Sequence, residues 1–128
     1  MNILVLSVLV TLSMVSLITA YCNNPRYSDG CSVELFGKRL PYFFKKKFTP
    51  ACNKHDICYA CGSVYGITRF NCDNIFHRNM HRLCRWWNIP CKSFPADYWT
   101  AVRLFGSNRY VNNSKSWCRR RWVRSCLR

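Results

Sequence analysis

The chain has 128 residues, ten cysteines and a formal net charge of +15 at pH 7. This length predicts one small domain, near the lower limit for a self-sufficient core. So positive a chain is attracted to anionic surfaces such as phospholipid headgroups or acidic glycans.

Residues 1–20 form an almost wholly apolar stretch without a single Lys, Arg, Asp or Glu. Its length, and the small Ala20 at its end, predict a secretory signal peptide. A retained membrane anchor is the alternative. With cleavage after Ala20, residues 21–128 would form a single secreted domain, and secretion disfavours nucleic acid as a partner.

All ten cysteines lie after Ala20. An even number in a short secreted chain indicates a disulfide framework, in which each bridge contributes about 2–4 kcal/mol. The spacing Cys58-x-x-Cys61 also fits a zinc or redox motif, but an oxidising compartment with eight other cysteines favours structural bridges.

Residues 21–48 show no clear period and are punctuated by proline and glycine, so we expect loops. Within them, Asp29 and nearby backbone carbonyls offer the hard oxygen ligands that calcium prefers, although an ordinary Asp-Gly turn explains the same letters. Residues 40–48, LPYFFKKKF, join four aromatic rings to three lysines. This composition suits a lipid interface, or some of its rings pack in the core.

Residues 49–62, TPACNKHDICYACG, predict a helix with Thr49 as N-cap, Pro50 in the first turn and Gly62 at the C-terminal end. At about 100° per residue, His55 shares one face with Ala51, Cys52, Cys58 and Tyr59, and Asp56 lies on its flank. A histidine with an adjoining carboxylate suggests a catalytic base beside a metal ligand. A core-facing histidine is the alternative.

Residues 72–88 predict a second helix, ended by Pro90, and residues 96–105 predict a short third one. The apolar face of the second helix comprises Cys72, Phe76, Met80, Leu83 and Trp87. Asp73 lies at the edge of this face, where a carboxylate is costly unless it has a partner. The simplest partner is a histidine on the facing helix. His77 and His81 have metal-ligand spacing but lie toward the polar side.

The sequence resembles the secreted phospholipases A2. The similarity lies in Cys52-x-x-His55-Asp56-x-Cys58-Tyr59, in Cys72-Asp73 on a following helix, and in a loop around Cys31. It spans roughly residues 28–84 and is strongest to the conodipine branch, the cone-snail venom type. The family's glycine-rich calcium loop is replaced by SDGCSVELFGKRL, and Ala51 stands where a second cysteine commonly precedes the motif.

The resemblance implies a mainly α, disulfide-rich phospholipase A2-like fold with two antiparallel helices carrying the active site. It implies calcium-dependent hydrolysis of the sn-2 ester of glycerophospholipids, which releases a fatty acid and a lysophospholipid. The implied catalytic residues are His55 as general base, Asp73 as its support, and Tyr59. The implied Ca2+ ligands are Asp56, Gly30, Ser32 and, as a possible further one, Asp29. The implied bridges are Cys31 to Cys52 and Cys58 to Cys72.

A secreted venom hydrolase would have a phospholipid membrane surface as its partner, and a receptor or channel target is possible. The competing hypothesis is a non-enzymatic cationic toxin or membrane-perturbing protein on a phospholipase scaffold. A third hypothesis is a disulfide-rich antimicrobial protein. The intact His55, Asp56 and Asp73 favour the enzyme.

Overall fold

The described part of the chain, residues 2–32 and 42–128 of a computed structural model, is helical in every regular element. In chain order the elements are α1 (Ile3–Cys22), α2 (Tyr42–Cys61), the 3-10 helix η1 (Gly62–Tyr65), α3 (Arg69–Leu83), α4 (Ile89–Phe105), the 3-10 helix η2 (Ser116–Arg119) and α5 (Arg121–Cys126). Ten cysteines form five disulfide bonds. The predicted mainly α, disulfide-rich fold is confirmed.

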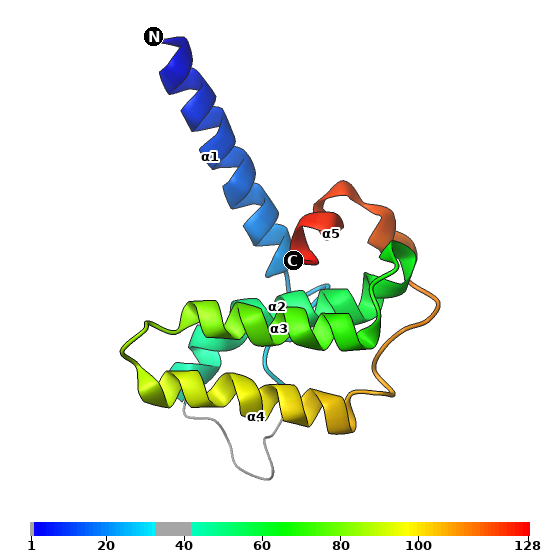
Figure 1. Cartoon of the computed structure of the whole chain (residues 1–128). Coiled ribbons are helices and arrows are strands. Elements are labelled where there is room, and N and C mark those ends of the chain that lie inside the picture. The colour runs from blue at the N-terminus through cyan, green and yellow to red at the C-terminus, as the bar shows by residue number, and fades with distance from the viewer. Residues whose placement is uncertain (1, 33–41) are drawn as a thin grey trace.

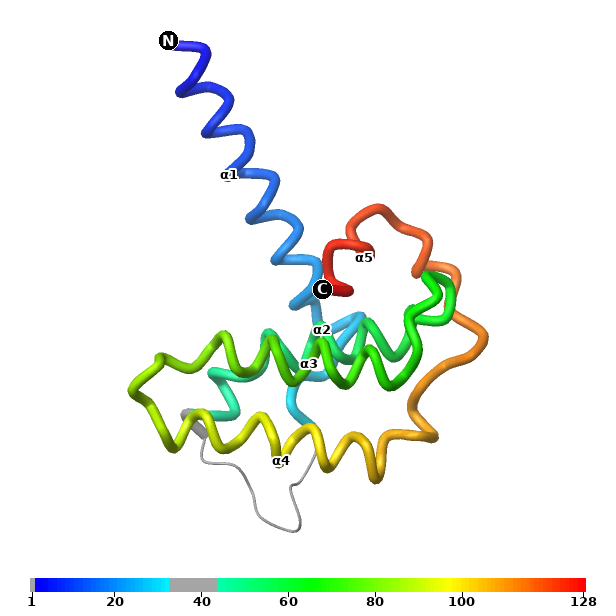
Figure 2. The backbone as a smooth tube through the Cα atoms, viewed as in Figure 1, coloured from blue at the N-terminus to red at the C-terminus, as the bar shows by residue number. Residues whose placement is uncertain are grey.

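Helices α2, α3 and α4 lie alongside one another, and α3 runs opposite to the other two (Figure 1). The backbone reverses at each connection, which the tube view makes easy to follow (Figure 2). Between these helices the side chains of Phe48, Phe76, Met80 and Tyr98 are almost completely buried. The predicted antiparallel helix pair therefore exists as α2 and α3, with α4 as a third member.

Helix α2 begins at Tyr42, so the expected start at Thr49 was wrong and residues 42–48 are not a loop. Pro50 lies inside the helix, where its ring costs about 3 kcal/mol and leaves a carbonyl without its usual donor. Burial of the Phe48 side chain against α4 offsets this penalty.

Helix α3 also differs from its predicted range, because it begins at Arg69 and ends at Leu83. Thr68 is its N-cap and accepts from the Asn71 backbone N–H. Pro90 does not end this helix but lies in the first turn of α4, which Asn88 caps. Trp87 is consequently outside α3 and 56% exposed, not on its apolar face.

Helix α4 begins earlier than predicted, with Pro95 inside it, and ends at Phe105 as expected. At the end of α2, Gly62 is required by close approach. A Cβ there would lie 2.8 Å from the Ile67 carbonyl oxygen and 3.2 Å from the Cys72 sulfur. The expected end of the helix at this glycine is confirmed.

Helix α1 projects away from the bundle (Figure 1). It is one helix of 20 residues with mean hydropathy 2.5, long and apolar enough to cross a membrane, and a signal sequence near an N-terminus has the same properties. Its last residue, Cys22, is joined to Cys126 of α5. Cleavage after Ala20 would leave this bridge in the mature protein.

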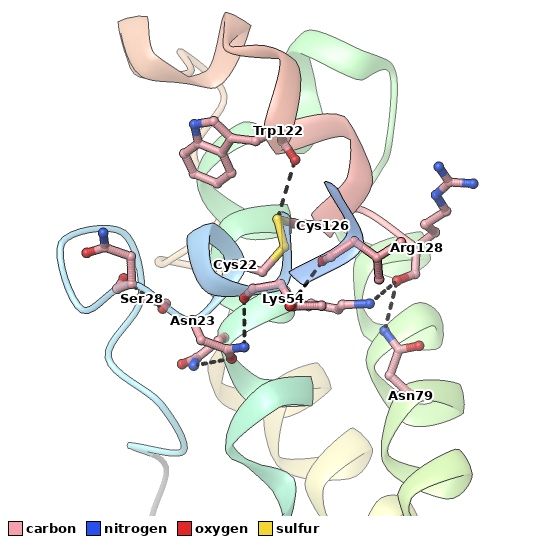
Figure 3. The surroundings of a disulfide bond; sticks show 12 residues. Cys22, Asn23, Ser28, Lys54, Asn79, Trp122, Cys126 and Arg128 are labelled. Carbon is pink, nitrogen blue, oxygen red and sulfur yellow. Dashed lines mark hydrogen bonds between the residues drawn. A yellow bond between two sulfur atoms is a disulfide. The ribbon is translucent and has the colours of Figure 1, made fainter. Parts of the chain in front are cut away.

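The end of the chain rests on the bundle around that bridge (Figure 3). Lys54 of α2 and Asn79 of α3 both donate to the Arg128 carbonyl oxygen, at 3.1 and 3.3 Å. The tail tryptophans pack inward as well, since Trp117 and Trp122 contact the Tyr27 ring. These contacts hold the C-terminal segment against the back of the helices that carry the site.

Candidate active site

Asp73 of α3 has no exposed surface, and both of its carboxylate oxygens accept hydrogen bonds. Its Oδ1 lies 2.8 Å from His55 Nε2 and 2.7 Å from the Tyr59 hydroxyl, both on α2. Its Oδ2 accepts from Arg103 Nη1 of α4 at 2.7 Å. Arg69 Nη1, one turn earlier on α3, lies 4.0 Å from the same oxygen.

Helix geometry and one disulfide bring these groups together. His55 and Tyr59 are four residues apart and therefore lie on the same face of α2. The Cys58–Cys72 bridge joins this face to α3 immediately before Asp73. The predicted contact between Asp73 and a histidine of the facing helix is present, and so are both bridges that the resemblance implied.

Three hydrogen-bond donors decide the protonation of Asp73. Burial alone would raise the pKa of this carboxyl, but hydrogen bonds from His55, Tyr59 and Arg103 outweigh burial and lower the pKa below its usual range. The carboxyl is therefore an ionised carboxylate, which can only accept hydrogen bonds. His55 must donate from Nε2, so its Nδ1 carries the free lone pair.

The His55 ring is only 7% exposed and is held between two aromatic rings. The Phe76 ring lies 4.4 Å away, nearly parallel, and the Tyr59 ring lies 4.1 Å away. Burial lowers the pKa of His55 by more than the Asp73 carboxylate raises it. The imidazole is thus neutral near pH 7, fixed in orientation, and able to accept a proton.

Asp56 follows His55 on α2 and contacts the loop that precedes Cys31. Its Oδ2 accepts from the Asp29 backbone N–H at 3.0 Å. Gly30 has φ +74°, in the left-handed region that favours glycine, and its carbonyl accepts from the Ser32 N–H at 3.1 Å. Burial, followed by a hydrogen bond with the Asp29 side chain, raises the pKa of Asp56 to about 8.

The surroundings of the Asp56 carboxyl group fit a hard cation, whose charge would favour the ionised form. Among residues 2–32 and 42–128, no Lys or Arg forms an ion pair with Asp56. Gly30 and Ser32 line the same cavity as Asp56 and offer oxygen ligands, the type that Ca2+ prefers. No group of three or more His, Cys, Asp or Glu side chains gathers in the described chain, so backbone oxygens would have to complete the coordination.

The two remaining metal motifs do not form metal sites in the part of the chain that the structure describes. Cys58 and Cys61 belong to separate bridges, to Cys72 and to Cys118. The rings of His77 and His81 lie 5.2 Å apart on the outside of α3, and no third His, Cys, Asp or Glu of the described residues completes a site with them.

A cavity of about 240 Å³ opens beside His55 and Asp56. One wall is apolar and comes from α4. The residues of this wall are Tyr98, Ala101, Val102 and Phe105. Arg109 lies at the exposed side of the cavity, where its Nη1 is 3.4 Å from the Ser32 hydroxyl. The cavity thus combines the acceptor nitrogen of His55, the carboxyl group of Asp56, an apolar wall and the Arg109 guanidinium.

Sequence reasoning missed three arginines of this site. Arg69 had a signal, because it precedes Asp73 by four residues on one helix face. Arg103 and Arg109 lie 30 and more residues after Asp73 in a chain with 20 basic residues, and nothing local marks them. Only the packing of α4 against α3 brings Arg103 to the carboxylate.

Comparison with known proteins gives a consistent family. Conodipine-P2 and Conodipine-P1 of Conus purpurascens are each 45% identical over 60 residues, which is 47% of this chain and 31% of theirs. Conodipine-M alpha chain of Conus magus is 40% identical over 57 residues, which is 44% of this chain and 69% of that one. The matched part thus spans about a third of the longer relatives.

No family model matches the chain, and no solved structure matches it. The similarity to conodipines agrees with the histidine, the two aspartates and the disulfides found in the structure. Because the match is 40% identical and covers 69% of the Conus magus relative, this chain belongs to the conodipine family.

Proposed function

We propose that the chain is a secreted, calcium-dependent phospholipase A2 of venom, which hydrolyses the sn-2 ester of glycerophospholipids to a fatty acid and a lysophospholipid. One observation carries the proposal. The His55–Asp73 pair and the Asp56 carboxylate meet at a single cavity with an apolar wall. The resemblance to secreted phospholipases A2 and the conodipine relatives support the same reaction.

His55 acts as general base. Its Nδ1 takes a proton from a water molecule in the cavity, and that water attacks the ester carbonyl carbon. Asp73 holds Nε2–H and stabilises the imidazolium that forms, while Tyr59 and Arg103 keep the carboxylate in place. The proton then passes from His55 to the leaving glycerol oxygen, and the carboxylic acid is released.

Asp56 would hold Ca2+ together with the backbone oxygens of Gly30 and Ser32, and Asp29 is close enough to contribute. The bound ion would supply positive charge to the substrate phosphate and to the developing oxyanion. The apolar wall from α4 would exclude water around an acyl chain. Arg109 at the mouth would contact the phosphate, because a guanidinium matches its geometry.

The apolar helix α1 is compatible with a signal peptide, and the disulfides fit a protein made for an oxidising compartment. A second candidate is a non-enzymatic cationic toxin that perturbs membranes or acts on a receptor or channel. The net charge of +15 and the exposed tryptophans support it. The two candidates differ in whether His55 is needed for activity.

The test uses purified residues 21–128 and a soluble short-chain phospholipid labelled in its sn-2 acyl group. We expect release of the labelled fatty acid, and loss of this release with EGTA and in His55→Gln. His81→Gln, which changes an exposed histidine outside the site, is the matched control and should be fully active. Equal release by His55→Gln would contradict the proposal, and vesicle leakage without any hydrolysis would support the toxin.

A further inference from the structure

The turn between α3 and α4 exposes three large apolar side chains. Trp86, Trp87 and Ile89 are 77%, 56% and 70% exposed. The two indole rings contact each other, with centroids 5.4 Å apart, and not the interior. We call residues 84–91 the tryptophan turn. By contrast, the tryptophans of the C-terminal tail pack against Tyr27.

The tryptophan turn is built to stay rigid. The Cys84–Cys91 disulfide closes it, and both cysteines are buried. Asn88 donates its backbone N–H to the Arg85 carbonyl at 3.0 Å, and its side chain accepts from the Cys91 N–H at 3.0 Å. The turn therefore presents the two indole rings without a large ordering cost on binding.

Basic side chains lie at the same end of the bundle as the exposed rings, and the neighbouring stretch of sequence carries no carboxylate. The Arg85 guanidinium lies 5.2 Å from the centre of the Trp87 ring. The start of α2 lies at the same end of the bundle, because Phe44 contacts Phe94 of α4 at 4.7 Å, and it brings the exposed Lys45 and Lys46. Residues 74–96 contain no Asp or Glu.

We propose that the tryptophan turn inserts Trp86, Trp87 and Ile89 into the interface of an anionic phospholipid membrane, with Arg85, Lys45 and Lys46 facing the headgroups. Indole rings favour the boundary between headgroups and acyl chains, and basic side chains beside it gain from negative lipid. The charge also disfavours a second copy as occupant, since two such ends would bring like charges together. The inference rests on the proposed function, because it takes the membrane to be the surface that holds the substrate.

The tryptophan turn lies outside the cavity. The turn precedes α4, whereas the cavity is lined by the second half of this helix, from Tyr98 to Phe105, and by Arg109 after it. Along the helix, Ile89 and Tyr98 are about 14 Å apart. A change in the turn should therefore alter residence on vesicles and leave the reaction with a dissolved substrate unchanged.

The experiment measures cosedimentation of residues 21–128 with vesicles of equal parts phosphatidylcholine and phosphatidylglycerol, in EGTA so that lipid stays intact. We expect Trp86→Ala/Trp87→Ala to weaken binding about tenfold or more, and Trp86→Phe/Trp87→Phe to retain most of it. Hydrolysis of a soluble short-chain phospholipid should be unchanged in both variants. Brominated lipid should quench wild-type fluorescence and leave that of the alanine variant nearly unquenched.

A charge-matched pair isolates the flanking cations. Lys45→Gln/Lys46→Gln should bind these vesicles more weakly than Arg119→Gln/Arg121→Gln, which removes the same charge from the exposed tail. Unchanged binding of the alanine variant overturns the inference. The inference is also overturned if the alanine variant self-associates less than wild type in the absence of lipid. Absence of hydrolysis in every form, with tryptophan-dependent vesicle binding intact, would instead refute the proposed function alone.

Discussion

Arg103 of α4 donates to Asp73 of α3 at 2.7 Å, so a guanidinium from a third helix holds the carboxylate that supports His55. Asp73 has no exposed surface, whereas the Arg103 side chain is 27% exposed. The same helix provides the apolar wall of the cavity. The position of α4 thus affects both the placement of His55 and the cavity beside it.

Replacing Arg103 should test this coupling. Arg103→Met leaves Oδ2 of Asp73 without its nearest donor, so we expect kcat to fall about 10- to 100-fold through misplacement of the imidazole. The free energy of unfolding should fall by about 1–3 kcal/mol, since a hydrogen bond to a buried charge is lost. Arg103→Lys should recover much of kcat. KM for a soluble substrate should change little.

Arg78→Met is the matched control for this experiment, because Arg78 is exposed on α3 and away from the cavity. Both variants are measured for kcat, KM and thermal unfolding. A loss of stability in Arg103→Met without any loss of kcat would limit Arg103 to a structural role.

A second prediction concerns the charge of Asp73 itself. In Asp73→Asn one oxygen becomes an amide that donates, so it faces either Arg103 or the pair of His55 and Tyr59 with the wrong polarity. We expect kcat to fall by about 10² to 10⁴, by analogy with loss of the supporting carboxylate in catalytic triads. Asp97→Asn, at an exposed position of α4, should keep wild-type kcat. Near wild-type activity of Asp73→Asn would remove this residue from the mechanism.

Much of this site was predictable, and the residues show why. The period of an α-helix places His55 and Tyr59 on one face, and a carboxylate at an apolar edge required a partner, so Asp73 could be matched with His55 before any fold was known. The helix starts were less predictable. Thr49-Pro50 is typical of a helix N-terminus, but burial of Phe48 against α4 extends the helix to the residues before this pair.

The interhelical arginine could not have been found in this way. Arg103 contacts Asp73 only because α4 packs on α3, and its sequence neighbours carry no matching charge. The tryptophan turn was missed for a related reason. Helical periodicity placed Trp87 on the apolar face of α3, whereas the helix ends at Leu83 and the Cys84–Cys91 bridge turns the chain outward.

A third prediction tests the proposed calcium site without using activity. Calcium at about 100 times its dissociation constant should stabilise the wild-type fold by about 2.7 kcal/mol, because the ion binds the folded state. Asp56→Asn should lose this stabilisation, since it removes the charged oxygen at the centre of the site. Thermal unfolding with Ca2+ and with EGTA measures the effect, and Asp97→Asn should respond like wild type. An equal calcium response in Asp56→Asn would place the ion elsewhere.

The last prediction concerns recognition of the substrate phosphate by Arg109. Its guanidinium lies beside Ser32 and borders the cavity that contains His55 and Asp56, so it can reach an anionic group near the ester. Arg109→Gln should raise KM for a soluble phospholipid about tenfold, the equivalent of one charge-assisted hydrogen bond, with kcat little changed. Because Arg109 is exposed, high salt should reduce the difference between wild type and variant. Arg119→Gln removes the same charge from the tail and should leave KM unchanged. If both variants raise KM equally, overall charge and not a contact at the cavity governs substrate binding.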